Sequence, residues 1–510
     1  MNVLLAVPLV VPLLGAALTL LLRRLPTAQQ IASSLVLLVV VADAAVLLAH
    51  TADGTVVVSQ AGGWPAPLGI TLVADPLAAL LVLVSSVVLL IVLLYAIGQD
   101  IGGLSRATPQ VFHPIYLVLT AGVCLSFVSG DLFNLFVGFE MMLTASYALI
   151  TQAPTRSRVR ASMIYTLVSL TSSILFLTGI ALVYALTGTI NLADIAGKLG
   201  AATPALRMVL ALLFLVVFGI KAAIVPMHFW LPDSYPVALT RISAIFAALL
   251  TKVAVYAVIR TQTLLFARDD ISTVLLWVAV ATMIVGILGA LVQDDVNRVA
   301  SFALVSHIGF MIFGLALGTV AALAGVLLYL VHHIVAQASL FLVNGLIRQF
   351  VGHTSLRAIR GLTTVSPVLA ALFFVPAMSL AGLPPTSGFV AKVALFQAGV
   401  ALGTWQAYVG IAAGVLTSAL TLIALFRIWT RAFWGTPLPD MVEAKQRLRN
   451  ASNRGGLRMM TAMTAVMVTA GLVVALVAGP LSELGFTAAH DLVDGEAYIH
   501  AVLGEEAPTP

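Results

Sequence analysis

Three lysines and one glutamate lie within strongly apolar segments of this 510-residue chain. They are Lys221, Lys252, Lys392 and Glu140, and Glu140 is the only glutamate before residue 443. A charge at the centre of a membrane helix costs about 2.5–3.5 kcal/mol on insertion scales, so such residues are rare unless they have a function. Amines and carboxylates take up and release protons, so these residue types in this setting predict a proton relay.

The choice of lysine over arginine supports proton transfer. Only five of the 25 basic residues are lysines, yet three of the five fall within apolar segments. Arginine stays protonated in proteins, whereas burial can remove the proton from a lysine. The competing interpretation is that a lysine extends to the interface and keeps its charge in water. Lys252 lies eight residues from Arg260, or about 12 Å along a helix, which is too far for that.

Histidines and hydroxyls in other apolar segments give weaker signals. His307, His332 and His333 could relay protons because histidine titrates near neutral pH, although a lone helix histidine is often structural. His332 and His333 are adjacent and therefore point about 100° apart on a helix, so we expect them to face different surroundings. Asp43 lies only seven residues from His50, and we expect it to reach the membrane surface. A hydroxyl-rich segment could hold water or could pack helices together; it contains Tyr165, Ser169, Ser172 and Ser173.

The composition places these residues in a membrane. The chain is 61% hydrophobic and 9% charged, whereas soluble domains carry about 25% charged residues. Recurring apolar segments of about 20 residues predict an all-α polytopic membrane protein. The first segment lacks the features of a cleaved signal peptide, so we expect it to be retained. The fourteen segments are residues 2–22, 31–49, 76–97, 112–129, 131–150, 160–187, 207–231, 237–259, 271–292, 297–316, 318–347, 365–402, 405–433 and 459–480.

The same composition argues against several kinds of site. Cys124 is the only cysteine, so an internal disulfide and a cysteine metal cluster are excluded. We expect no metal site and no cofactor, and the sequence shows no nucleic-acid footprint. A hydrolytic enzyme has no support either, because no nucleophile–base set and no phosphate-binding loop is present.

The basic residues predict the orientation. Seventeen Lys and Arg residues fall on the face that follows odd-numbered segments, including the run "KQRLRNASNRGGLR", and only four fall on the other face: Lys198, Arg207, Arg260 and Arg268. Cytoplasmic loops carry the excess of basic residues, and an even number of spans puts both termini on one side. We therefore expect both termini outside the cytoplasm of a cell membrane, with an acidic tail after the last segment.

Two of the spans are interrupted by prolines close to a lysine. "IKAAIVPMHFWLP" contains Lys221, and "SLAGLPPTSGFVAK" ends at Lys392. Proline removes a backbone donor, and a freed carbonyl in lipid needs another partner or a wet cavity. Paired interruptions in two halves of a chain point to an ion path near the midplane.

The spacing of the markers suggests an internal repeat. Lys392 follows Lys221 by 171 residues, and His307 follows Glu140 by 167. Five spans separate the partners, so the two repeats run in opposite directions. We predict inverted five-helix repeats formed by spans 4–8 and 9–13, with helices 7 and 12 broken. The predicted units are residues 1–110, 111–260, 261–434 and 435–510.

Three stretches carry a family resemblance: "SGDLFNLFVGFEMMLTASYALI", "IKAAIVPMHFWLPDSYPVALTRISAIFAALLTKVAVYAVIR" and "LAGLPPTSGFVAKVALFQAG". The chain resembles the D-subunit family of Mrp-type sodium/proton antiporters and, more broadly, the antiporter-like subunits of respiratory complex I. The resemblance implies a fourteen-helix subunit of a hetero-oligomeric antiporter complex that moves H+ and Na+. Its partners would be the other subunits, especially the large A subunit and the small C subunit.

The resemblance also implies roles for individual residues. Glu140 matches a glutamate that pairs with the span-seven lysine, Lys221, and Lys252 matches the lysine that connects two half-channels. Lys392 matches the residue at the far half-channel, and His307 with His332 or His333 occupies the relay positions. Arg241, near the start of span eight, is not matched to a position of the family.

Two other functions are compatible with the sequence. One is a proton-pumping subunit of a quinone-linked or hydrogenase-linked redox complex, which differs in its energy source. The other is a structural scaffold whose buried charges only bind partner subunits. Neither composition nor spacing shows where a metal cation would travel.

Overall fold

The structure is a computed structural model that describes residues 3–101, 110–152, 155–266, 271–437 and 454–504. Arg106 and Arg268, which contribute to the predicted orientation, lie outside the described residues. The same holds for most of the basic run that begins at Lys445.

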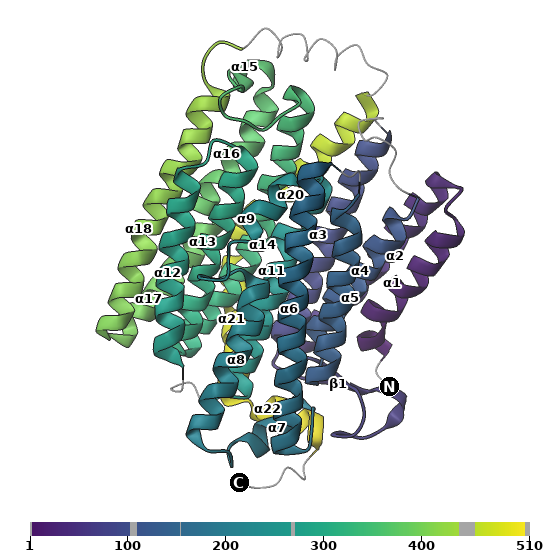
Figure 1. The fold of residues 1–510 in the computed structure, drawn as a ribbon, viewed down its shortest axis with the longest axis vertical. Coiled ribbons are helices and arrows are strands. Elements are labelled where there is room, and N and C mark those ends of the chain that lie inside the picture. Colours follow the sequence, from purple (N-terminus) through teal and green to yellow (C-terminus); the bar gives the residue numbers. More distant parts are fainter. Residues whose placement is uncertain (1–2, 102–109, 153–154, 267–270, 438–453, 505–510) are drawn as a thin grey trace.

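The chain forms a bundle of helices with one small β-hairpin (Figure 1). Strands β1 Val57–Gln60 and β2 Thr71–Ala74 pair antiparallel. The helices are α1 Val3–Leu21, α2 Pro26–Thr51, α3 Pro76–Ile101, α4 Phe112–Val128, α5 Leu132–Ile150, α6 Arg156–Thr187, α7 Leu192–Leu199, α8 Pro204–Ala222, α9 Leu231–Ser234, α10 Thr240–Ile245, α11 Thr251–Leu264, α12 Ser272–Leu291, α13 Val296–Leu317, α14 Val320–Val351, α15 Leu362–Val365, α16 Pro367–Ala381, α17 Ser387–Leu402, α18 Trp405–Ile428, α20 Arg454–Leu476, α21 Ala478–Asp494 and α22 Glu496–Leu503.

Fourteen crossings can be counted in the described part of the chain. Twelve helices are long and apolar enough to cross a membrane. The shorter apolar helix α4 supplies another crossing, and α16 together with α17 supplies the last. The prediction of an all-α polytopic membrane protein is thus confirmed.

Local sequence explains where key helices begin and end. Asp131 and Asp295 accept hydrogen bonds from first-turn amides of α5 and α13, which satisfies donors that have no partner within a helix. Pro204 and Pro367 open α8 and α16, at a position where the missing amide costs nothing. The interrupted spans are also observed: α8 ends at Ala222 and is followed by turns, and α16 and α17 are separated by residues 382–386.

Backbone landmarks recur along the chain at a fixed interval. Asp131 and Asp295, at the starts of α5 and α13, lie 164 positions apart. Gly188 and Gly352, the left-handed residues that end α6 and α14, have the same separation. The connection that contains α7 lies at the lower end of Figure 1, and the connection that contains α15 lies at the upper end. The two halves therefore run in opposite directions, as an inverted repeat requires; the predicted unit boundaries stay a prediction.

One predicted correspondence between the repeats is wrong. Ala223 and Gly382, the left-handed residues after α8 and α16, lie 159 positions apart. At that interval Leu380, and not Lys392, occupies the place of Lys221. The two lysines are therefore not equivalent positions of the repeat, because Lys392 belongs to the helix after the interruption and Lys221 to the helix before it.

The helices differ in how deeply they are buried. The hydrophobic windows of Thr240–Leu264 and α14 are completely buried, whereas only 33% of the α1 window and 22% of the α20 window are buried inside the protein. The central helices therefore form a core that other helices shield from lipid. The described part of the acidic tail expected after the last span forms helices: α21 packs along α14, and α22 packs on α7.

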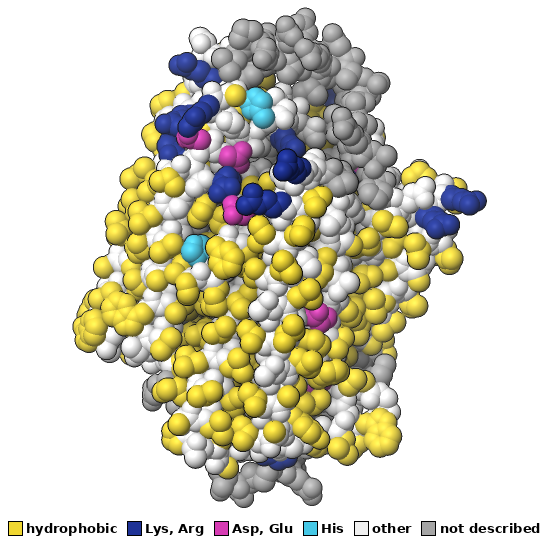
Figure 2. Space-filling view, viewed as in Figure 1, with side chains coloured by type: hydrophobic (Ala, Val, Ile, Leu, Met, Phe, Trp, Pro, Cys, Tyr) yellow, Lys and Arg dark blue, Asp and Glu magenta, His cyan; other side chains and the backbone are white. Residues whose placement is uncertain are grey.

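The surface follows the expected membrane pattern. In Figure 2 hydrophobic side chains cover the middle of the molecule, and Lys and Arg gather towards the upper end. Two predicted face residues are not simple surface charges. Arg158 is buried and donates to the carbonyls of Gln152 and Val237, and Arg260 is buried in an ion pair with Asp75.

Candidate functional site

Glu140 and Lys221 are joined through a serine. Ser173, on α6, donates a hydrogen bond to the Glu140 carboxylate on α5. Lys221, in the last turn of α8, donates to Ser173 Oγ over 3.1 Å. The ammonium also lies 5.2 Å from the ring centroid of Phe139, at a distance at which a cation is attracted to the ring face. The Ser173 hydroxyl thus donates one hydrogen bond to the carboxylate and accepts one from the amine, so it connects the two groups.

Lys252 follows an irregular turn that the sequence did not reveal. Residues Phe246–Leu250 form a π-helical segment between α10 and α11. Lys252 is fully buried, and its Nζ donates to the carbonyl of Ala247 over 2.5 Å. Single π-helical turns inside α-helices are frequent at functional sites. Here the irregular turn presents a carbonyl to a lysine in the interior of the bundle.

Lys392 reaches back across the interruption of span twelve. Its Nζ donates to the carbonyls of Leu380 and Ala381, at 2.9 and 3.1 Å. These carbonyls belong to the last turn of α16, where the helix leaves acceptors unpaired and carries partial negative charge. Gly382 has a φ of 84°, and a β-carbon there would lie 2.8 Å from the Lys392 chain. Glycine is therefore needed both for the backbone and for the approach of the lysine.

His332 faces the same interruption. Its Nδ1 lies 2.9 Å from Ser387 Oγ and 3.4 Å from Ser379 Oγ. A β-carbon at Gly388 would lie 1.9 Å from the Ser379 carbonyl and 2.8 Å from the His332 ring. The absence of a side chain at Gly388 lets α16, α17 and the histidine meet closely.

His333 faces the other way, towards α13. Its ring stacks on that of His307, with centroids 5.3 Å apart and planes 10° apart. His307 Nδ1 shares a hydrogen bond of 2.8 Å with Tyr329 Oη. Both imidazoles are completely buried. The expectation that the adjacent histidines face different surroundings is therefore confirmed.

These groups lie on helices that contact one another one after the next across the bundle. The α8 helix, with Lys221, packs on α11, and the π-helical turn before Lys252 packs on α14. The α14 helix, with both histidines, packs on α13 and α17. Carboxylate, hydroxyl, amine and imidazole groups thus extend from the first repeat to the second through the interior.

Known proteins are similar to this chain in sequence and fold. Residues 129–421 match the family model described as NADH:quinone oxidoreductase/Mrp antiporter, TM. The chain is 36% identical to the D subunit of the Na(+)/H(+) antiporter of Alkalihalophilus pseudofirmus, over 99% of this chain and all of that protein, and 35% identical to the corresponding D subunit of Bacillus subtilis over the same shares. It belongs to the NADH:quinone oxidoreductase/Mrp antiporter family.

Two solved structures have the same fold as this chain. A chain of the Mrp complex from Dietzia sp. DQ12-45-1b superposes with a TM-score of 0.89 at 33% identity, covering 99% of this chain and all of that one. A chain of an archaeal membrane-bound sulfane sulfur reductase reaches 0.86 at 23% identity, covering 98% and 99%. The second likeness concerns the fold alone.

The charged residues of the site could be predicted from the sequence, but the polar residues that hydrogen-bond to them could not. Six of the seven predicted site residues are buried in the arrangement described above, and the seventh, Glu140, is partly exposed; the six are Lys221, Lys252, His307, His332, His333 and Lys392. Ser173 was visible in the sequence only as one of several hydroxyls. Tyr329 and Ser387 gave no separate signal, since their partners lie on other helices.

The structure also places Asp43, whose predicted position is wrong, and Arg241, for which no role was predicted from the sequence. Asp43 is buried in α2, and its Oδ2 has no hydrogen-bond partner among the described residues, so the expectation that it reaches the surface is wrong. Arg241 donates to Asp100 over 3.1 Å and lies 4.5 Å from the ring centroid of Phe112. It therefore joins α3, α4 and α10 rather than the relay.

A separate ion pair, formed by Arg260, lies about two helical turns after Lys252 on α11. Arg260 Nη2 lies 2.5 Å from Asp75 Oδ2, and both side chains are almost completely buried. The guanidinium lies 5.5 Å and 5.0 Å from the ring centroids of Tyr256 and Tyr498. Since Tyr498 belongs to α22, the C-terminal helices complete this cluster and shield it from solvent.

Proposed function

We propose that the chain is the proton-translocating subunit of a multi-subunit Na+/H+ antiporter. One observation carries the proposal: three buried lysines each lie against an irregularity of a helix. Lys221 occupies the last turn of α8, Lys252 follows the π-helical turn, and Lys392 contacts the end of α16. Carbonyls accept from the ammonium groups of Lys252 and Lys392, and the helix C-terminus near Lys221 carries partial negative charge. A shift in the irregular turn would withdraw that stabilisation.

The relay begins at Glu140. With Ser173 between them, the Glu140 carboxylate and the Lys221 ammonium stabilise each other's charged form. A change that weakens this link lets Lys221 release its proton towards Lys252. Lys252 then passes it to the stacked imidazoles of His333 and His307, and His332 connects them with Lys392. Protons therefore move sideways through the core before they leave through the second half-channel.

Other parts of the proposal concern the setting of the chain. The subunit lies in the cell membrane with its upper, basic end in the cytoplasm and both termini outside. Its partners are other subunits of the antiporter, especially the large A subunit and the small C subunit. The Na+ path lies in a partner or at an interface, because the described spans present no cluster of carboxylates, histidines or cysteines suited to a metal ion.

A redox-driven proton pump is the second candidate. It is favoured by one observation, the family model, whose description includes NADH:quinone oxidoreductase subunits. The two functions differ in what drives proton movement. Exchange driven by a sodium gradient alone supports the antiporter, and proton movement only with a redox substrate supports the pump.

The test uses inverted membrane vesicles that carry the whole complex. We expect addition of Na+ to change the internal pH without any redox substrate. Lys221→Arg keeps the positive charge but does not release a proton, so exchange should be lost while the subunits still purify together. Wild-type exchange in Lys221→Arg would exclude the relay role, and loss of assembly in both Glu140→Ala and Lys252→Ala would favour a scaffold.

A further inference from the structure

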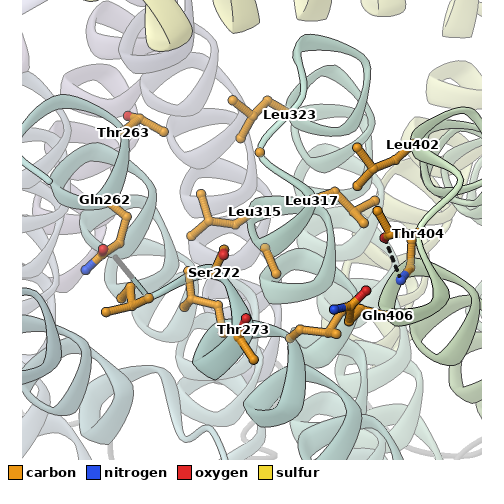
Figure 3. Close-up of a pocket in the computed structure, with 16 residues that line it drawn as sticks. Gln262, Thr263, Ser272, Thr273, Leu315, Leu317, Leu323, Leu402, Thr404 and Gln406 are labelled. Carbon is orange, nitrogen blue, oxygen red and sulfur yellow. Dashed lines mark hydrogen bonds between the residues drawn. The ribbon is translucent and has the colours of Figure 1, made fainter. Parts of the chain in front are cut away.

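A cavity of about 450 Å³ opens at the lower end of the second repeat (Figure 3). It lies where α11, α13 and α17 end and where α12, α14 and α18 begin. Hydroxyls and amides share its wall with leucines, and among the described residues no lining side chain carries a formal charge. Labelled examples in Figure 3 are Gln262, Ser272, Thr404 and Gln406. A space of this size with polar groups in its wall can hold water.

A line of hydroxyls descends from the relay towards this cavity. Thr421, on α18, lies 3.5 Å from His307 Nε2 and donates to the carbonyl of Thr417. Thr417 is one turn closer to the cavity and completely buried, and its Oγ1 has no hydrogen-bond partner among the described residues. An unsatisfied buried hydroxyl costs about 1–3 kcal/mol. A water that enters from below would satisfy it.

Three phenylalanines fill the space between the hydroxyls and the cavity. Phe310 lies directly beneath the relay, with its ring centroid 5.8 Å from that of His307 and 4.9 Å from Lys392 Nζ. Its centroid lies 6.3 Å from that of Phe396, on α17. Phe313 lies one turn further along α13 towards the cavity and is completely buried. Because phenylalanine rings carry no polar group, the line of hydroxyls is interrupted where these rings lie.

The rings rest on two glycines of α18. A β-carbon at Gly410 would lie 2.1 Å from the Phe313 ring, and one at Gly414 would lie 2.7 Å from Phe396 and 3.2 Å from Phe310. Gly410 and Gly414 are four residues apart and therefore share one helix face. The rings are thus held by close packing against the backbone of α18.

We propose that the cavity is the outer water vestibule of the second half-channel, and that Phe310, Phe313 and Phe396 close it from His307 and Lys392. The inference rests on the proposed function and locates the exit of that path. In the closed arrangement the three rings exclude water from Thr417. When they move aside, water connects the vestibule with Thr417, Thr421 and His307, and the proton leaves along this line.

Cysteine labelling tests the proposal in the assembled complex. The chain's only cysteine is replaced by Cys124→Ser, and Gln406→Cys or Thr417→Cys is then added. A small, membrane-impermeant methanethiosulfonate is applied to each side of the membrane. We expect Gln406→Cys to react rapidly from one side, and Thr417→Cys to react at least about tenfold more slowly, as burial beneath a packed layer requires.

Opening the layer should reverse this result. Phe313→Ala should raise the labelling rate of Thr417→Cys about tenfold or more and should let protons leak without Na+. Gly410→Ala, which displaces the same ring, is the second variant and should act in the same direction. Phe373→Ala removes a buried ring that packs on Phe433 at the upper end, and it should leave the labelling of Thr417→Cys unchanged.

Two outcomes would overturn the inference. One is equal labelling of Thr417→Cys and Gln406→Cys while all three phenylalanines are present. The other is unchanged labelling and unchanged leak in both Phe313→Ala and Gly410→Ala. Labelling does not require exchange, so absence of Na+-driven exchange in the Cys124→Ser complex would refute the proposed function separately.

Discussion

Lys392 Nζ lies 2.9 Å from the carbonyl oxygen of Leu380, the residue that stands in the second repeat where Lys221 stands in the first. Both repeats therefore place an ammonium at the end of the helix that precedes the interruption. In the first repeat the lysine belongs to that helix, and in the second it comes from the helix beyond the break. The position of the charge is preserved although the position in the sequence is not.

The Ser173 hydroxyl should be necessary for rapid exchange. Ser173→Ala removes the contact between Glu140 and Lys221, and hydrogen bonds to charged groups contribute about 1.5–3 kcal/mol. We expect exchange to fall about tenfold to a hundredfold, whereas Ser173→Thr retains most of it. Ser172→Ala is the matched control, since Ser172 donates only to the Val217 carbonyl in the described structure. Equal loss in both alanine variants would argue for a packing role, and sodium-driven exchange in vesicles distinguishes these cases.

Gly388→Ala should damage the interruption of span twelve. The added carbon would meet the Ser379 carbonyl at 1.9 Å and the His332 ring at 2.8 Å. Overpacking of this kind typically costs about 1–3 kcal/mol, so the purified complex should unfold at a lower temperature. Gly479→Ala serves as the control because nothing lies within 4 Å of its added carbon. An unchanged unfolding temperature in Gly388→Ala would show that α16 and α17 separate without cost.

Arg260→Ala should destabilise the protein because it leaves the Asp75 carboxylate without its ion-pair partner. Asp75 would remain buried without its partner, and breaking a buried pair in this way costs about 3–5 kcal/mol. We expect a large drop in thermal stability or in the amount of assembled subunit. Arg298→Ala removes an exposed partner of Asp233, with side-chain exposures of 40% and 55%, and such pairs contribute about 0–1 kcal/mol. Similar losses of thermal stability in Arg260→Ala and Arg298→Ala would show that burial does not increase the cost of breaking the ion pair.

Docking of α21 should weaken as the pH rises. The pKa of Asp491 is raised to about 6, chiefly by burial; the nearby Asp75 and Asp494 also raise the pKa, whereas Arg260 and His490 lower it. Because the folded-state pKa exceeds the ordinary 3.8, the neutral acid favours the docked helix. This contribution is complete below pH 3.8 and is lost as the pH passes through about 6.

Hydrogen exchange of the α21 amides measures this effect. After correction for the intrinsic pH dependence of exchange, protection should be greater below pH 6 than above it. Asp491→Asn should remove that difference, whereas Asp494→Asn, an exposed change on the same helix, should retain it. A pH-independent protection in the unaltered protein would show that ionised Asp491 is accommodated without loss of docking.

Membrane class, the number of spans and the identity of the charged residues could all be predicted from the amino-acid sequence. Apolar segments of membrane length follow directly from composition, and a lysine inside such a segment is visible because the cost of its burial is a local property. Prolines and glycines near Lys221 and Lys392 also marked the interruptions, since they limit what the backbone can do whatever surrounds it.

Which groups meet could be learned only from the packed helices. The contact of Ser173 with both Glu140 and Lys221, the stacking of His307 on His333 and the burial of Asp43 each depend on how separate helices pack. The π-helical turn before Lys252 is likewise absent from any local pattern. Span positions depend on short-range hydrophobicity, whereas these contacts depend on the relative rotation and depth of helices far apart in the chain.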